Sequence, residues 1–235
     1  MDPRVSSGSE VIDILLNGGL EKDIITTVFG SAGTGKSNFA MIIAINAAKT
    51  GKVIFIDTEG GFSIDRARQI APDFDKLANN LRIMKPIEFE DQQKAIRELR
   101  EIIKKEQISL IVIDSLTMLY RLERPEDPKE INLELTKQLS ILSSIARRNN
   151  IPIFVTNQVY SSFDNRNDIK MVGGEILSYW GKCLIRLDKV GSTRKAEIIK
   201  HRSQPEGKRI FFDIVNEGLK ETSEPKQKER SFSLF

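Results

Sequence analysis

The stretch "GSAGTGKS", residues 30–37, decides the fold of this chain. It fits the pattern G-x-x-x-x-G-K-[ST], and it lies between an apolar run at 24–30 and an apolar helical stretch at 36–49. Glycines in such a loop let backbone N–H groups turn inward onto phosphate oxygens, and the start of the helix adds favourable dipole charge. The sequence therefore predicts a phosphate-binding loop between a strand and a helix, rather than an ordinary glycine-rich turn.

The side chains of this loop have expected roles in holding a nucleotide and its metal ion. We expect Lys36 to reach the β- and γ-phosphates and the Ser37 hydroxyl to bind Mg²⁺. The residues expected to line the phosphates are Gly30, Ser31, Ala32, Gly33, Thr34, Gly35, Lys36, Ser37 and Asn38.

The composition favours one globular domain with a sizeable core. The chain has 235 residues, of which 40% are hydrophobic and 29% charged, and its net charge of +3 is too small to indicate a nucleic-acid binder by itself. The one cysteine, Cys183, excludes an internal disulfide and lies in an apolar run, so we expect it to be buried. The first ten residues have no apolar signal-peptide core, and no apolar run approaches a membrane span, so we expect a cytoplasmic protein.

The apolar pattern predicts an α/β fold, a RecA-like P-loop core with a mostly parallel central sheet flanked by helices. Strands buried on both faces are expected at 24–30, 53–57, 110–114 and 151–156, because these runs do not alternate with polar residues. Helical faces are expected at 91–106 and 130–148. After residue 181 three strands follow one another, which predicts an antiparallel extension. We expect the core to cover 1–218, and 219–235 to be a disordered tail.

Two carboxylates follow predicted strands and should lie near the loop. Asp114 ends the run 110–114, where ligands collect in open α/β sheets, so it can hold the Mg²⁺ shell. Glu59 comes two residues after the run 53–57, and it is the best candidate to orient a water molecule for hydrolysis. Its alternative role is a negative charge that favours the start of the next helix, and both roles are compatible.

The chain resembles the RecA/RadA recombinase family in its archaeal and eukaryotic branch, and it is most like an archaeal paralogue of the main recombinase. The resemblance covers nearly the whole chain. It rests on "SGSEVIDILLNGGL" (7–20), "IDTEGGFSIDRA" (56–67), "LIVIDSLTMLYR" (110–121), "FVTNQV" (154–159), "VGG" (172–174) and "HRSQPEG" (201–207). It implies an ATP- and Mg²⁺-dependent ATPase of the DNA-dependent class that is slow.

The resemblance also implies roles for individual residues. Glu59 matches the catalytic glutamate, and Arg66 matches an arginine that stacks on the adenine. Gln158 matches a glutamine that senses the γ-phosphate and passes its state to a DNA-binding loop. Lys200 and Arg202 match basic residues that reach a neighbouring subunit's nucleotide, and their alternative is a solvated strand end.

Two departures from the family pattern shape the expected function. The core begins at about residue 5, so the N-terminal helical domain and the Phe-x-x-Ala linker of that branch have no counterpart, which favours an assistant over a filament-forming recombinase. Two loops, 121–130 and 159–172, match the DNA-binding loops but mix basic with acidic residues. The residues expected to contact single-stranded or branched DNA with modest affinity are Arg121, Arg124, Tyr160, Arg166 and Lys170.

Three functions remain open at this point. The first is a DNA-binding ATPase that assists the main recombinase in homologous recombination and repair. Its tail, which ends in a charged segment followed by Phe232, Leu234 and Phe235, would dock on that recombinase or another repair protein. The second is a strand-exchange recombinase that acts as a filament. The third is a KaiC-like signalling ATPase that assembles with ATP and does not bind DNA.

Overall fold

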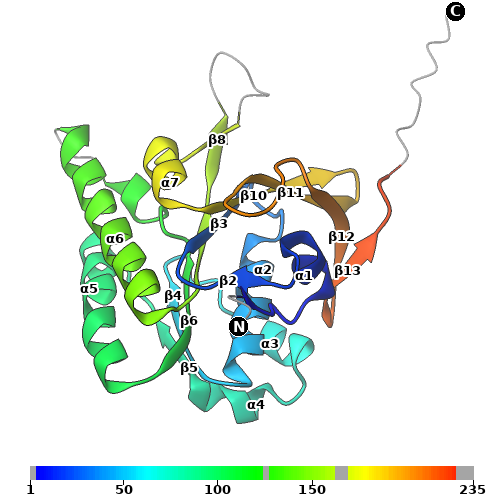
Figure 1. Ribbon diagram of the computed structural model, residues 1–235, viewed down its shortest axis with the longest axis horizontal. Helices are drawn as coiled ribbons and strands as arrows, with labels where there is room; N and C mark the ends of the chain where they lie inside the picture. Colours follow the sequence, from blue (N-terminus) through cyan, green and yellow to red (C-terminus); the bar gives the residue numbers. More distant parts are fainter. Residues whose placement is uncertain (1–3, 124–126, 162–168, 226–235) are drawn as a thin grey trace, which may run out of the picture.

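The computed structural model describes residues 4–123, 127–161 and 169–225. It has one large central sheet with helices on both faces (Figure 1). Nine strands form this sheet in the order β13-β12-β11-β10-β3-β7-β6-β4-β5. Two short two-stranded ribbons lie outside this sheet. One is formed by β1 (Arg4–Val5) with β2 (Leu20–Glu21), and the other by β8 (Val159–Ser161) with β9 (Ile169–Met171).

The parallel part of the sheet contains the four strands that the sequence predicts. They are β3 (Ile25–Gly30), β4 (Lys52–Asp57), β6 (Ile108–Asp114) and β7 (Ile153–Asn157), with β5 (Leu81–Met84) at the edge. Every neighbouring pair among these five strands is parallel. The four predicted strands are buried over most of their length, which agrees with their largely apolar sequences.

The antiparallel extension follows β3 on its other side. It consists of β10 (Cys183–Val190), β11 (Thr193–His201), β12 (Arg209–Val215) and β13 (Gly218–Thr222). β10 pairs in parallel with β3, whereas the later strands are joined by antiparallel hairpins, which confirms the predicted extension. Cys183 is buried, and burial raises the pKa of its thiol to about 12.

The expected start of the tail at residue 219 is wrong. Residues 218–222 form β13, whose backbone pairs with β12 from Phe211↔Thr222 to Val215↔Gly218. Gly218 adopts φ +133 after the turn, and Leu219 packs against the core, so a turn glycine and an apolar side chain extend the sheet by one strand. The apolar residues expected at the end of the tail, within 226–235, lie outside the described residues.

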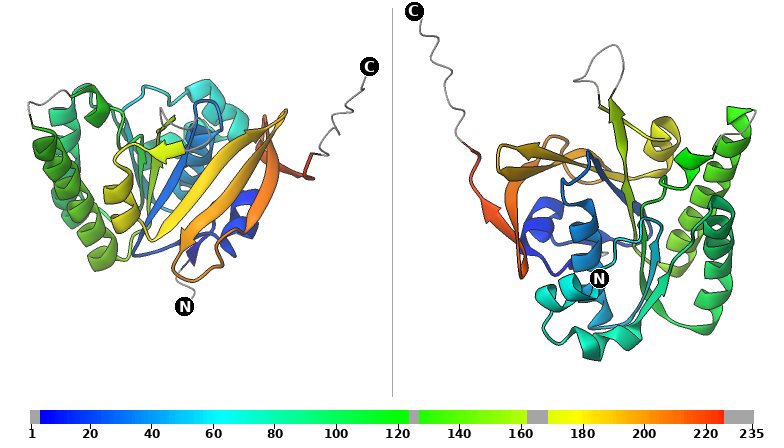
Figure 2. Two further views of the ribbon diagram at one scale, coloured as in Figure 1. Left: turned by 90° about the horizontal axis from the view of Figure 1, so that it is seen from above. Right: turned by 180° about the vertical axis from the view of Figure 1, so that it is seen from behind.

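The helices divide between the two faces of the sheet, as two views at right angles show (Figure 2). One face is covered by α1 (Glu10–Leu16), α2 (Lys36–Ala48), α3 (Ile64–Ile70) and α4 (Phe74–Leu77). The other is covered by α5 (Phe89–Lys105), α6 (Pro128–Asn149) and α7 (Gly174–Trp180). Among the described residues, no helix is long and apolar enough to cross a membrane.

The register of the parallel strands fixes where functional side chains meet. β3, β7, β6 and β4 are adjacent and run in one direction, so their carboxyl ends lie at one edge. These ends carry the loop after Gly30, then Gln158, Asp114 and Glu59. The fold therefore brings together four residues that are far apart in the sequence.

Candidate nucleotide-binding site

The phosphate loop joins β3 to α2 and leaves the start of the helix open. Gly35 is the N-cap residue with φ +106, and no side chain caps this end. The first N–H groups of α2 therefore point toward the loop with the positive end of the helix dipole. A Cβ on Gly30 would lie 2.3 Å from the carbonyl oxygen of Leu187, so the backbone there packs too closely for any other residue. The loop has the shape and the donors of an anion site.

Lys36 lies at the centre of the loop and is nearly buried. Its Nζ donates hydrogen bonds to the carbonyl oxygens of Gly30 and Ser31, at 2.9 and 3.0 Å. Burial lowers the pKa of this ammonium, while the charges of Glu59 and Asp114 act in the opposite direction. Both of these hydrogen-bond acceptors are neutral carbonyls, so a phosphate close to the ammonium would stabilise its charge.

Asp114 is a buried carboxylate behind the loop. Burial raises its pKa to about 6, hydrogen bonds from Thr156 and Ser37 oppose that shift, and the charges of Glu59 and Asp57 add to it. Within the described residues no group of three or more His, Cys, Asp or Glu side chains could hold a metal ion. A carboxylate and a hydroxyl are oxygen donors that suit Mg²⁺, which takes its remaining ligands from phosphate and water. The pair Ser37 and Asp114 fits the predicted metal site.

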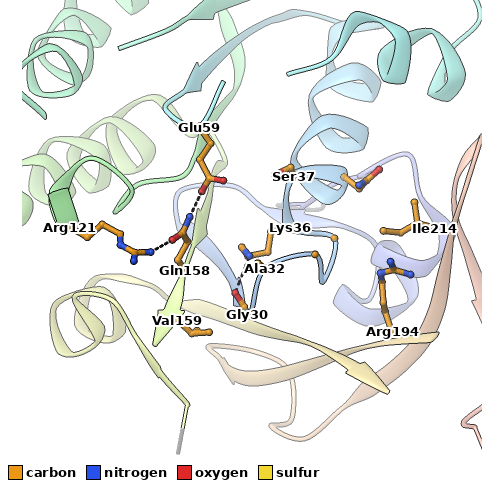
Figure 3. Close-up of a pocket in the computed structure, with 13 residues that line it drawn as sticks. Gly30, Ala32, Lys36, Ser37, Glu59, Arg121, Gln158, Val159, Arg194 and Ile214 are labelled. Carbon is orange, nitrogen blue, oxygen red and sulfur yellow. Dashed lines mark hydrogen bonds between the residues drawn. The ribbon is translucent and has the colours of Figure 1, made fainter. Parts of the chain in front are cut away.

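The segment that carries Glu59 is fixed by hydrogen bonds between side chains and the backbone. The Asp57 carboxylate accepts from the N–H groups of Gly61 and Phe62, both at 3.0 Å, which closes a tight turn. The Thr58 hydroxyl donates to the carbonyl oxygen of Ser115 at 2.7 Å, tying the turn to the segment after β6. The residues on both sides of Glu59 are therefore held, and its side chain projects into the cavity (Figure 3).

Gln158 connects two charged residues across the site. Its Nε2 donates to Oε1 of Glu59 at 2.8 Å, and its Oε1 accepts a hydrogen bond from Arg121 (Figure 3). The preceding residue, Asn157, is buried and donates to the carbonyl oxygen of Val172 at 3.0 Å. The Gln158 amide thus links the candidate catalytic carboxylate to Arg121 after β6, and the neighbouring Asn157 amide bonds the residue that follows β9.

A cavity of about 440 Å³ lies over the loop. Seven of the residues predicted to line the phosphates contribute to its wall together with Glu59 and Gln158, and four other residues complete the wall. The predicted loop residues in the wall are Gly30, Ala32, Gly33, Gly35, Lys36, Ser37 and Asn38, and the further residues are Arg121, Val159, Arg194 and Ile214. The sequence analysis missed Arg194, because its position depends on the register of the β10–β11 hairpin.

Arg66 lies beside the cavity rather than in its wall. Its guanidinium donates to Asn38 Oδ1 at 2.9 Å and to the carbonyl oxygens of Val215 and Asn216 at 2.8 and 2.9 Å. Hydrogen bonds from a guanidinium lie in its plane and leave its faces open for stacking. The predicted contact of Arg66 with an adenine stays a prediction.

Lys200 and Arg202 lie at the opposite end of the sheet from the loop. β11 ends at His201, which pairs with Cys183 at the start of β10, whereas Leu187 of β10 pairs with Gly30. Lys200 donates to the carbonyl oxygens of Ser178 and Gly181, and Arg202 pairs with Glu21 and with Asp23 at 2.8 Å. Neither residue can reach the cavity of its own chain, so a role toward a neighbouring subunit stays a prediction.

The predicted DNA contacts are only partly within the described residues. Arg124 and Arg166 lie outside them, and for Lys170 only the backbone is described, paired with Tyr160 in the β8–β9 ribbon. Tyr160 is 53% exposed. Arg121 lies in the cavity wall, where it bonds Gln158, so the structure places it at the nucleotide site.

The fold and the site define a P-loop nucleotide-binding protein of the RecA-like class, and three comparisons agree. A family profile described as Rad51 matches residues 3–222. DNA repair and recombination protein RadB of Methanobrevibacter smithii is 43% identical over 88% of this chain and 92% of its own length. RadB of Methanococcoides burtonii is 42% identical over 92% and 97%.

A solved structure described as the RadB recombinase is also similar. It superposes with a TM-score of 0.80 at 34% identity, and the alignment covers 93% of this chain and 99% of that one. This chain belongs to the Rad51 family, and the proteins named here as its relatives within that family are RadB proteins.

The buried Asp114 carboxylate should make the metal-free protein less stable at neutral pH than at a pH where this carboxyl group is protonated. Because its folded pKa is raised from 3.8 to about 6, the folded chain binds this proton more tightly than the unfolded chain, and stability falls as pH rises across that interval. Asp114→Asn should raise the free energy of unfolding by about 3 kcal/mol at about pH 7.5 without Mg²⁺ or nucleotide, and by about half as much at about pH 5.

Urea unfolding at the two pH values measures this difference. Asp73→Asn is the control, because Asp73 is exposed and caps α4 without a side-chain hydrogen bond. If Asp114→Asn and the unchanged protein were equally stable at neutral pH, burial of a charged Asp114 carboxylate would not destabilise the fold.

Proposed function

We propose that this chain is an ATP-binding and DNA-binding accessory protein of homologous recombination and DNA repair that hydrolyses ATP slowly with Mg²⁺ and assists the main recombinase. The observation that carries the proposal is the convergence at one sheet edge of the phosphate loop, Asp114, Glu59 and Gln158. Membership of the Rad51 family and the names of the RadB relatives support the biological role.

The residues divide the work of hydrolysis. The loop N–H groups and Lys36 would hold and neutralise the phosphates, and Ser37 with Asp114 would hold Mg²⁺. Glu59 accepts a proton from the attacking water or orients it, and its position on a fixed turn suits that task. The bound Mg²⁺ supplies charge neutralisation on the phosphate oxygens.

The Gln158 bridge gives the site a means of sensing its contents. In the bridged arrangement the Glu59 carboxylate accepts a hydrogen bond from the Gln158 amide. A γ-phosphate competes for the same amide donor, and Gln158 lies directly before the β8–β9 ribbon that carries Tyr160. Movement of this amide therefore couples the nucleotide to a predicted DNA contact.

Two substitutions should separate binding from turnover. Lys36→Ala should abolish nucleotide binding, because the phosphates lose their buried cation. Glu59→Gln should keep binding but lower turnover about 100-fold, because an amide cannot take a proton from water. Calorimetric titration with Mg²⁺–ATP measures nucleotide binding. Phosphate release, followed with and without single-stranded DNA and across protein concentration, measures turnover.

Glu101→Gln is the matched control, since Glu101 is exposed on α5, far from the cavity. Unchanged turnover of Glu59→Gln would show that Glu59 does not activate the water. Absence of ATP binding by the unchanged protein would contradict the proposed function as a whole.

DNA binding should be modest and electrostatic, with a stacking contribution. Affinity for single-stranded DNA should fall steeply between about 50 and about 200 mM salt. Tyr160→Ala should weaken binding about tenfold through lost stacking, whereas Tyr160→Phe, which keeps the ring, should bind normally. Fluorescence anisotropy with a labelled oligonucleotide measures both effects. ATP-dependent assembly without any DNA affinity would instead support a KaiC-like signalling ATPase.

A further inference from the structure

The β10–β11 hairpin continues past the end of β3 and overhangs the phosphate loop. Leu187 pairs with Gly30, the last residue of β3, and β10 runs on to Val190 before β11 returns from Thr193. Within the described residues, the β3 pairing of β10 therefore stops at Leu187, and the hairpin beyond it has no strand beside it on that side.

The hairpin carries two pairs of cations, and the strand alternation separates them. Lys189 and Arg194 are direct cross-strand partners, so their side chains share one face. That face is the one on which Leu187 and Ala196 are buried in the core. Arg186 and Lys195 belong to the opposite face.

The cations of the opposite face are neutralised within the hairpin. Arg186 pairs with Asp188 at 3.0 Å and with Glu197 at 2.9 Å. Lys195 pairs with the same two carboxylates at 3.2 and 2.8 Å. Two acids thus balance two bases there, which is a sufficient structural role for those four residues.

The cations on the loop side have no such balance. Over the described ranges of the chain neither Lys189 nor Arg194 forms an ion pair, and the Nε of Arg194 is buried without a hydrogen-bond partner. Lys189 Nζ lies 2.9 Å from the position that a Cβ on Gly33 would take, and Arg194 Cδ lies 3.7 Å from the corresponding position on Gly35. The absence of side chains on these glycines is what lets both cations approach the loop.

Arg194 also lines the cavity itself. It lies on the wall beside Ile214, across the loop from Glu59 and Gln158 (Figure 3). A buried guanidinium nitrogen without a hydrogen-bond partner is costly, and an anion in the cavity would provide an acceptor and opposite charge.

We propose that Lys189 and Arg194 form a second cationic wall of the phosphate site, supplied by the same chain, that binds the polyphosphate chain of the nucleotide opposite Lys36. This inference rests on the proposed nucleotide-binding function and adds residues that hold the ligand. It means that one subunit neutralises the phosphate charge by itself, so nucleotide binding does not require the cations of a neighbouring subunit.

Calorimetric titration of the full chain with Mg²⁺–ATP, and separately with tripolyphosphate, tests the wall. Lys189→Gln and Arg194→Gln should each weaken both ligands about tenfold, since each removes a charge-assisted contact. Tripolyphosphate is included because it lacks base and sugar, so a parallel loss locates the effect at the phosphates. Arg194→Lys should recover part of the affinity.

Lys195→Gln is the matched control, because it removes one positive charge from the same hairpin on the opposite face. It should change affinity less than about twofold. Thermal unfolding without ligand shows whether each variant is folded. Lys189 is exposed, so Lys189→Gln keeps the test decisive if Arg194→Gln does not fold.

Several results would overturn the proposal. One is normal affinity of both Lys189→Gln and Arg194→Gln for Mg²⁺–ATP and tripolyphosphate. Another is an equal loss of affinity in Lys195→Gln. A third is that the loop-side variants lose single-stranded DNA binding but keep nucleotide affinity. Affinity that appears only as protein concentration rises would place the needed cations in a neighbouring subunit. Failure of the unchanged protein to bind either ligand would instead overturn the nucleotide-binding function on which the proposal rests.

Discussion

The parallel pairing of β3, β7, β6 and β4 is the constraint on which the rest of the structure depends. Because these strands are adjacent and point one way, a loop, two carboxylates and an amide meet at one edge of the sheet. The same edge receives the uncapped start of α2, whose N–H groups and dipole favour an anion. Continuous burial on both faces holds the strands in this register, so the apolar core positions the polar site.

The charges at this edge are incompletely compensated inside the protein. Lys36 is held by two neutral carbonyls, the Asp114 pKa is raised by burial, and Arg194 has a buried nitrogen without a partner among the described residues. Each of these conditions costs stability without a ligand, and under the proposed function each would be relieved by a nucleotide with its metal ion. The protein thus keeps a strained electrostatic arrangement that binding completes.

Much of this arrangement follows from the sequence. Continuous apolar runs predict the buried parallel strands, because few other structures bury such runs on both faces. The loop pattern, the Asp114 that ends one run and the segment "DTEGG" then predict the site at the ends of these strands. The resemblance supplied Gln158, whose bond to Glu59 the pattern alone does not indicate.

The positions of Arg194 and Lys189 depend on hairpin register, which a shift of one residue would invert, so the sequence did not identify them. The strand β13 is short and charged, so its sequence has no apolar run that predicts a strand. Its pairing to β12 nevertheless extends the sheet. Arg121 was expected at the DNA and lies in the cavity wall, because the turn after β6 folds back toward Gln158.

A crystal structure of the chain with Mg²⁺ and a non-hydrolysable ATP analogue tests the central claim most directly. The triphosphate should lie in the cavity over the loop, Lys36 should leave the carbonyl oxygens of Gly30 and Ser31 for the phosphates, and Gln158 should release Glu59. A nucleotide bound elsewhere, or a bound triphosphate with the Gln158–Glu59 hydrogen bond intact, would contradict it.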